Sequence, residues 1–384
     1  MSRMKKPGRA TIAVHPPDAA PTPTVPLAPP LTTASVYRFG DLDTLLSASR
    51  GEKAAQTFYR RYGHPNGRAV EQTVAALEGG EDALACSAGM SAVATIFQTL
   101  LARGDRVLAA RDLYGGTYAY LDTFMARLGV ELEFTDLHRI EREVPEGVRL
   151  VVVETISNPR IRVADLAAIS RNAKKAGAVL VVDNTFATPV LCRPLEWGAD
   201  VVFHSGTKFL NGHGDATSGI IVGKADTIRA MRKLTILAGG VISPLDAWLT
   251  SRGLKTLALR VECASRNAAR LARFLSRHRK VARVNYPKAG KYLKPLLGPM
   301  LSFELKGGLK AADRFVRGCR LIALVPSLGD VTTTSTHPAR SSHAYLSPAA
   351  REAMGVTDGL IRISTGIEDV DDILEDLSQA LSKV

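Results

Sequence analysis

Hydrophobic residues between positions 56 and 243 gather in short runs that are separated by longer periodic stretches. Five runs are nearly continuous in Val, Leu and Ala, as strands covered on both faces are, and they lie at 106–110, 130–136, 149–156, 178–185 and 200–208. Periodic stretches at 68–80, 89–104 and 163–177 predict helices. This alternation predicts an α/β domain with a mostly parallel sheet.

The pattern differs on either side of this region. Residues 1 to about 35 are rich in proline and lack periodicity, which predicts an extended arm without a core of its own. After Pro244, a long helix is expected at about 253–277, and an amphipathic helix at 368–384 ends the chain. We therefore predict three parts, which are an arm that contacts a neighbouring subunit, a large domain and a smaller α+β domain, at residues 1–55, 56–243 and 244–384.

Composition narrows the class of protein. The chain has 384 residues, of which 46% are hydrophobic, and no apolar stretch is long enough for a membrane span or a signal core, so we expect a cytoplasmic protein. The net charge is +13, but the basic residues are scattered and lack interleaved aromatics. Nucleic acid is therefore not expected as a partner. An anionic cofactor and anionic substrates are a simpler explanation of the positive charge.

The four cysteines are widely spaced, at positions 86, 192, 263 and 319. They form no CxxC pair and have no histidine at ligand spacing, so neither a metal site nor a disulfide framework is expected. Small buried hydrophobic residues are the simpler interpretation.

Two neighbouring predicted strands end in residues that can carry chemistry. Asp183 ends VLVVD, and Lys208 follows VVFHSGT. Since the carboxyl ends of strands line the ligand crevice of a doubly wound sheet, both side chains should reach one cleft. A lysine amine that forms an imine and a carboxylate that keeps a ring nitrogen protonated are the partners that pyridoxal 5'-phosphate (PLP) requires. Taken singly, a turn-capping Asp and an exposed Lys are the commoner roles.

Neighbouring residues fit a phosphate and an aromatic ring. Ser205 and Thr207 offer hydroxyls beside Lys208, and GMS at 89–91 opens a helix whose free amides can hold a dianion. Tyr114 precedes two glycines and could stack on a pyridine ring, although a core-facing tyrosine in a turn fits equally well.

Two arginines are also candidates for anion binding. Arg61 follows Tyr59 in a polar loop, where an arginine fork beside a phenol suits a phosphate, although such a pair is usually only surface. Arg362 lies in the apolar strand GLIRISTG and would suit the carboxylate of an amino-acid substrate. The alternative is an arginine that faces solvent between Ile361 and Ile363.

Ordered motifs from about residue 30 to the end resemble those of the Cys/Met-metabolism PLP enzymes: YRRYGHPN, SAGM, DLYGGT, ETISNP, VVDNT, SGTKFLNGHGD, SPLDAWLTSRGLKTL, SLGD and LIRISTGIED. The resemblance implies the PLP-dependent transferase type I (aminotransferase-like) fold. It also implies that Lys208 is the Schiff-base residue, that Asp183 is the partner of the pyridine nitrogen, and that both are catalytic together with Tyr114.

The resemblance further implies which residues bind the cofactor and the substrate. The phosphate would be held by the amides of Gly89 and Met90 and by Ser205 and Thr207, with Tyr114 on the ring face. The phosphate of a neighbouring subunit would be held by Tyr59 and Arg61, so the active enzyme would be a homotetramer built from two dimers. The substrate carboxylate would be bound by Asn158, Ser327 and Arg362.

The reaction is the least determined feature. We expect γ-elimination from a sulfur amino acid such as methionine, cystathionine or homocysteine, with γ-replacement on an O-acylhomoserine as the alternative and cystathionine β-lyase as the third candidate. HGD at 213–215 and SLGD at 327–330 resemble methionine γ-lyases and homoserine sulfhydrylases, whereas Gly116 resembles the cystathionine enzymes. Thr332 stands where cystathionine γ-synthases and γ-lyases often have Glu, which favours a smaller substrate.

Two departures from the family pattern and one alternative remain. His64 replaces the usual Asn of the loop after Arg61, and the segment between Tyr286 and Ser302 is shorter than in most relatives. A binding protein that kept the fold without catalysis would be marked by loss of Lys208 or Asp183, and both residues are present.

Overall fold

The computed structural model describes residues 24, 26–50, 57–344 and 347–384, and residues 31–384 form one compact unit. Much of the predicted arm at 1–55 lies outside the described residues, and its contact with another subunit stays a prediction. Its described part includes helix α2 (Leu42–Arg50). None of the described helices is both long and apolar enough to cross a lipid bilayer.

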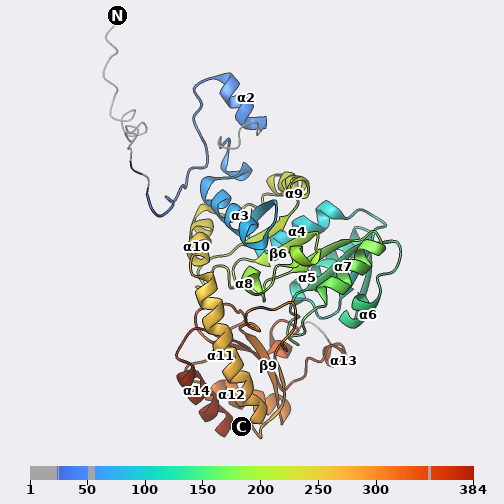
Figure 1. Ribbon diagram of the computed structural model, residues 1–384, viewed down its shortest axis with the longest axis vertical. Coiled ribbons are helices and arrows are strands. Elements are labelled where there is room, and N and C mark those ends of the chain that lie inside the picture. Colours follow the sequence, from blue (N-terminus) through green and yellow to red (C-terminus); the bar gives the residue numbers. More distant parts are fainter. Residues whose placement is uncertain (1–23, 25, 51–56, 345–346) are drawn as a thin grey trace, which may run out of the picture. The chain divides into compact units, whose positions relative to one another are not determined.

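A seven-stranded sheet carries the first and larger group of elements (Figure 1). Its spatial order is β1 (Asp82–Cys86), β7 (Gly219–Gly223), β6 (Val201–Ser205), β5 (Val179–Asp183), β4 (Val148–Glu154), β2 (Arg106–Ala110) and β3 (Glu131–Thr135). The five strands from β6 to β3 are parallel, and β7 pairs antiparallel with both β1 and β6. The predicted mostly parallel sheet is therefore confirmed, with all five predicted strands in it.

The helices of this group surround the sheet in Figure 1. They are α3 (Pro65–Glu78), α4 (Gly89–Leu100), α5 (Gly115–Ala119), α6 (Leu137–Arg142), α7 (Leu166–Lys175), α8 (Thr188–Leu191), α9 (Ala225–Ala238) and α10 (Pro244–Leu254). The central strands are covered on both faces, since Val151, Val181 and Ile221 are completely buried. Burial of each such side chain stabilises the fold by about 1.5–3 kcal/mol.

A five-stranded sheet forms the second group, in the order β10 (Ala323–Leu324), β11 (Thr334–Thr336), β12 (Leu360–Ser364), β9 (Met300–Leu305) and β8 (Val281–Asn285). Its helices are α11 (Leu257–Arg277), α12 (Gly308–Gly318), α13 (Pro348–Ala353) and α14 (Val370–Ser382). Phe303 of β9 meets Phe315 of α12 edge to face at 5.4 Å in the core between them. The expected α+β arrangement is confirmed, and the domain boundary at residue 244 stays a prediction.

Helix α11 runs from one hydrophobic core into the other. Leu257 and Val261 belong to the core of the larger sheet, whereas Leu271 and Leu275 belong to the core of the smaller one. All four side chains are nearly or completely buried, so both halves of the helix are fixed by packing.

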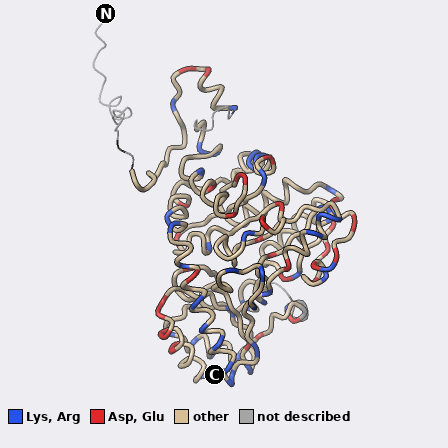
Figure 2. Tube along the Cα trace, in the orientation of Figure 1, with Lys and Arg blue, Asp and Glu red and all other residues tan. Residues whose placement is uncertain are grey.

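Charges of both signs are spread along the chain (Figure 2). The scattered basic residues of the sequence therefore remain scattered in space as well as along the chain. All four cysteines are free thiols. The expected burial is found for Cys86 and Cys192, whereas Cys263 and Cys319 are only partly buried.

Candidate active site

A cavity of about 250 Å³ lies at the carboxyl ends of β4, β5 and β6. It is lined by residues from the first sheet and from the loops of the second, as expected for a crevice at strand ends. Of the twelve residues proposed from the sequence, ten line it: Gly89, Met90, Tyr114, Asn158, Asp183, Ser205, Thr207, Lys208, Ser327 and Arg362.

Lys208 lies in a tight turn directly after β6. Its backbone amide donates to the carbonyl of Ser205 at 3.1 Å, and its carbonyl accepts from the amide of Gly212 at 2.8 Å. Its Nζ donates to Oγ of Ser327 at 2.7 Å. Burial, and to a lesser extent the positive charge of Arg362, lowers the pKa of the amine below its ordinary value.

Arg260 of α11 binds the backbone of the same turn, and it was not among the residues proposed from the sequence. Its guanidinium donates to the carbonyl oxygens of Phe209 at 2.8 Å, Leu210 at 3.4 Å and Gly253 at 2.8 Å. Burial lowers its pKa to about 10, so it stays positively charged at neutral pH. The position of the Lys208 turn is therefore fixed from helix α11.

Asp183 ends β5 and faces the cavity. Its Oδ1 accepts from the amide of Thr185 at 2.9 Å, so it caps a turn and lines the cavity at the same time. The turn-capping role considered from the sequence therefore does not exclude the other one. Burial raises the pKa of the carboxyl, and the hydrogen bonds of Thr185 act in the opposite direction.

The start of α4 meets the end of β6 at close range. A Cβ on Gly89 would lie 3.0 Å from both Cβ and Oγ of Ser205, so a side chain here would require Ser205 to shift. The helix has no side-chain cap, which leaves the amides of its first turn to a ligand. Oγ1 of Thr207 accepts from the amide of Ser218 at 3.0 Å beside them.

Tyr114 stands at the start of α5 with 44% of its surface exposed. A Cβ on Gly116 would lie 2.5 Å from Cε1 of Tyr114 and 2.9 Å from Sδ of Met90. Glycine at this position therefore leaves room for both the phenol ring and the side chain of Met90.

Arg362 is buried inside the cavity wall, with 3% of its surface exposed. Its Nη1 donates to Oδ1 of Asn158 at 2.9 Å, and its Nη2 donates to the carbonyl of Ser327 at 3.1 Å. Its Nε has no partner among the described residues. Burial lowers its pKa to about 10, so the side chain remains a cation at neutral pH. The alternative of an arginine facing solvent is wrong.

Tyr59 and Arg61 do not line this cavity. Both are exposed, and Nη1 of Arg61 donates to the carbonyl of Ile236 at 2.8 Å. The guanidinium lies 5.6 Å from the centre of the Tyr59 ring. Their role in a neighbouring subunit stays a prediction.

His64, the unusual residue of this loop, caps α3. Its Nδ1 accepts from the amide of Gly67 at 3.1 Å, and its Nε2 lies 3.0 Å from the carbonyl of Ile242. An asparagine could accept the same bond from Gly67, so the histidine preserves the capping function.

Other lining residues were not proposed from the sequence. Glu154 is the most important, since it is a buried carboxyl that ends β4 as Asp183 ends β5. The same strand-end argument could have found it. The remaining ones include Thr185, Phe203, Thr336, Ser341 and Ser342.

A family model described as Cys/Met metabolism PLP-dependent enzyme matches residues 10–382. The chain belongs to this family. The L-methionine gamma-lyase of Pseudomonas putida is 40% identical over 98% of both chains. The O-succinylhomoserine sulfhydrylase of Pseudomonas aeruginosa is 37% identical over 92% of this chain and 90% of the relative. Family membership and the type I fold are thereby confirmed.

The similar solved structures include that of an O-acetylhomoserine (thiol)-lyase, so described, from Campylobacter jejuni with N'-pyridoxyl-lysine-5'-monophosphate. It superposes with a TM-score of 0.88, is 29% identical, and covers 97% of this chain and 99% of that one. PLP is the cofactor of the family, and the residues of this cavity fit it. The cavity combines a buried amine, a buried carboxyl, an uncapped helix start beside two hydroxyls, and a tyrosine ring.

Proposed function

We propose that this chain is a PLP-dependent carbon–sulfur lyase that catalyses γ-elimination from a small sulfur amino acid, with methionine or homocysteine preferred over cystathionine. Methionine would yield 2-oxobutanoate, ammonia and methanethiol. The proposal depends most on one observation, which is that Lys208, Asp183 and Arg362 all line one cavity. An amine, an anion and a carboxylate-binding cation in one cavity are the groups that the chemistry requires.

The cofactor would be held from three sides. Lys208 would form the imine with its aldehyde, Asp183 would face its ring nitrogen, and the first amides of α4, at Gly89 and Met90, would bind its phosphate with Ser205 and Thr207. When bound, PLP supplies an electron-withdrawing ring that stabilises negative charge at the α-carbon of an amino acid.

The substrate would be oriented by its carboxylate. Arg362 offers the unpartnered Nε–H and a permanent positive charge, and Asn158 and Ser327 already bind its two terminal nitrogens. Arginine suits this role because its planar fork matches a carboxylate.

Proton transfer would fall to Lys208 and Tyr114. Since burial lowers the pKa of the Lys208 amine, a larger share of it is neutral, as a base that removes the α-proton must be. Tyr114 stands at the mouth of the cavity, where its phenol could donate a proton to the departing sulfur group.

The size and charge of the cavity support a small substrate. Glu154 and Asp183 are the acidic residues among the described residues that line it, and both are strand-end carboxyls. Neither is available for a second ammonium group at the far end of a substrate such as cystathionine. Thr332 is exposed and donates to Asp330, so that position itself does not line the cavity.

The alternative is γ-replacement on an O-acylhomoserine, the class to which the sulfhydrylase relative belongs by name. Elimination and replacement share their early steps and differ in whether a thiol or water reaches the intermediate. Cystathionine β-lyase remains the third candidate.

A substrate panel tests these alternatives. The PLP-loaded enzyme is given L-methionine, L-homocysteine, L-cystathionine, or an O-acylhomoserine with cysteine or sulfide, and 2-oxobutanoate, pyruvate and thioether products are measured. We expect 2-oxobutanoate from methionine. Thioether formation as the dominant activity would assign the enzyme to the replacement group, and pyruvate from cystathionine would assign it to the β-lyases.

The proposal also includes an assembly in the cytoplasm whose subunits share active sites. Tyr59 and Arg61 are exposed and lie outside the cavity of their own chain, which supports a role at the phosphate of a neighbouring subunit in a cytoplasmic homotetramer. Arg61→Ala should then weaken PLP retention, and mixing Arg61→Ala with Lys208→Ala chains should restore part of the activity. Absence of restored activity would count against shared sites.

A further inference from the structure

Glu154 is a buried carboxyl in the cavity that the proposed reaction does not use. It is the last residue of β4, pairs in register with Asp183 on β5, and has 7% of its surface exposed. A buried carboxyl costs free energy unless it makes hydrogen bonds, so its contacts indicate what it does.

The side chain of Glu154 lies close to two segments of the chain. Oε1 of Glu154 accepts from the backbone amide of Tyr114 at 2.5 Å, 40 residues earlier in the chain. The backbone of Asn158, four residues later, is near enough to the carboxyl to lower its pKa. One side chain thus connects the segment that follows β2 to the segment that follows β4.

Each of these segments carries a candidate site residue. Tyr114 brings the phenol ring, and Asn158 brings the amide oxygen that accepts from Nη1 of Arg362 at 2.9 Å. A continuous set of contacts therefore runs from Tyr114 through Glu154 and Asn158 to Arg362.

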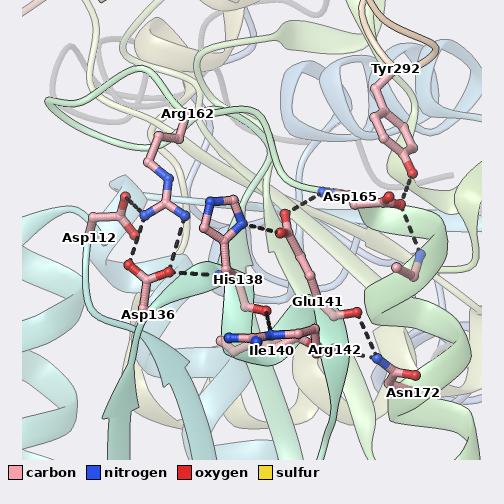
Figure 3. Close-up of polar contacts among 11 residues, drawn as sticks. Asp112, Asp136, His138, Ile140, Glu141, Arg142, Arg162, Asp165, Asn172 and Tyr292 are labelled. Atoms are coloured by element: carbon pink, nitrogen blue, oxygen red, sulfur yellow. Dashed lines mark hydrogen bonds and ion pairs between the residues drawn. The ribbon is translucent and has the colours of Figure 1, made fainter.

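A second connection joins the same two segments farther from the cavity (Figure 3). Arg162 forms two hydrogen bonds with Asp136, at 3.0 and 3.2 Å, and its Nη1 lies 3.9 Å from Oδ2 of Asp112. Asp112 and Arg162 stand two residues before Tyr114 and four residues after Asn158. Glu154 lines the cavity, whereas Asp112 and Arg162 do not.

We propose that Glu154 is a positioning residue that fixes the Tyr114 segment and the Asn158 segment in one arrangement, so that the phenol ring and the Arg362 site keep their spacing. The proposal rests on the proposed function for the roles of Tyr114 and Asn158. The contacts themselves do not depend on which sulfur amino acid the enzyme uses.

Burial raises the pKa of the Glu154 carboxyl well above its ordinary value, and the adjacent Asp183 raises it further. The hydrogen bond from the Tyr114 amide acts in the opposite direction. Positioning through this hydrogen bond requires an accepting oxygen and no charge, and a glutamine amide supplies such an oxygen as well.

Hydrogen exchange on the cofactor-free protein tests the proposal without any turnover. Glu154→Ala should speed amide exchange in peptides that span 112–118 and 155–161 by about tenfold or more, while strand β5 stays protected. Glu154→Gln keeps an accepting oxygen and the same shape, so it should exchange as the wild type does. Glu133→Ala removes a half-buried carboxyl from the edge strand β3, which β2 separates from β4, and is the control. Unchanged exchange in Glu154→Ala would overturn the proposal.

Two further measurements complete the test. Should Glu154→Ala not fold, Glu154→Asp shortens the side chain by one methylene and should speed exchange in the same two segments; unchanged exchange would overturn the proposal. In the PLP-loaded enzyme, Glu154→Ala should lower kcat by about 10²-fold, as a misplaced site does, and Glu154→Gln should restore it with the wild-type pH profile. A Glu154→Gln enzyme as slow as Glu154→Ala would overturn positioning through the accepting oxygen. An inactive wild type with the expected exchange pattern would refute the proposed reaction alone.

Discussion

The amine of Lys208 donates a hydrogen bond to Oγ of Ser327, which lies 119 residues farther along the chain. Lys208 follows the larger sheet and Ser327 lies in a loop of the smaller one, between β10 and β11. The same residue, through its carbonyl, accepts from Nη2 of Arg362. Ser327 therefore aligns the reactive amine with the carboxylate-binding cation.

Ser327→Ala should remove the contact with Lys208 and keep the contact with Arg362, because it removes the hydroxyl and leaves the carbonyl. We expect kcat/KM to fall by about tenfold, the equivalent of one hydrogen bond. Binding of PLP, measured by absorbance after gel filtration, should stay within about threefold, since the change removes a neutral contact. Thr332→Ala, an exposed hydroxyl in the same loop, is the control. Equal losses in both variants would contradict the role of Ser327.

Lys208→Met should stabilise the cofactor-free protein. The pKa of Lys208 is lowered by burial, so the unfolded state binds more protons than the folded state at pH values between the folded pKa and about 10.5. The free energy of unfolding of the wild type therefore rises with pH across that window. Below the window, the cost of burying the charged amine is paid in full. Urea unfolding at pH 7 and pH 9 should show the variant more stable at pH 7 and less dependent on pH. A less stable Lys208→Met protein would contradict the burial argument.

Gly116→Ala should disturb the phenol ring, since the new Cβ would lie 2.5 Å from Tyr114 and 2.9 Å from Met90. Overpacking of this kind costs about 1–3 kcal/mol, and here the ring can move to relieve it. We expect a fall in kcat of about tenfold or more with PLP still bound. Gly40→Ala, where a Cβ would meet nothing within 4 Å, is the control and should retain full activity.

His64→Asn should preserve the cap of α3, and His64→Ala should lose it at a cost of about 1 kcal/mol. The pKa of His64 is lowered from its ordinary value of 6.5, mainly by burial. The unfolded state therefore takes up the proton first, and the wild type loses stability as the pH falls below 6.5. Thermal unfolding between pH 7.5 and pH 5 should show a smaller loss for His64→Asn. Parallel curves would contradict the buried histidine cap.

Most of the sheet could be predicted because its strands are covered on both faces, and such strands are continuous in apolar residues. Strands β1 and β7 escaped this rule. DALAC is rich in Ala, and GIIVG begins and ends with glycine and so has a very short apolar run, which leaves neither with a distinctive pattern. The antiparallel insertion of β7 between β1 and β6 also breaks the regular alternation with helices.

The site was predictable where chemistry and strand ends coincide. Asp183 and Lys208 each follow an apolar run and were predicted. Glu154 also ends an apolar run, but it was overlooked because the proposed chemistry called for only one carboxyl. Arg260 could not be found from its own surroundings, since its two partners in the Lys208 turn lie about 50 residues away and are backbone carbonyls that any sequence supplies. Tyr59 and Arg61 cannot be placed from one chain at all.

Helix α11 has a mechanical consequence for catalysis. Its first turn holds, through Arg260, the backbone that bears the reactive amine, and its last turns are embedded in the core of the smaller sheet. Because both ends of this 21-residue helix are packed, we expect the turn that bears Lys208 to follow any displacement of the smaller sheet, to which Arg362 belongs.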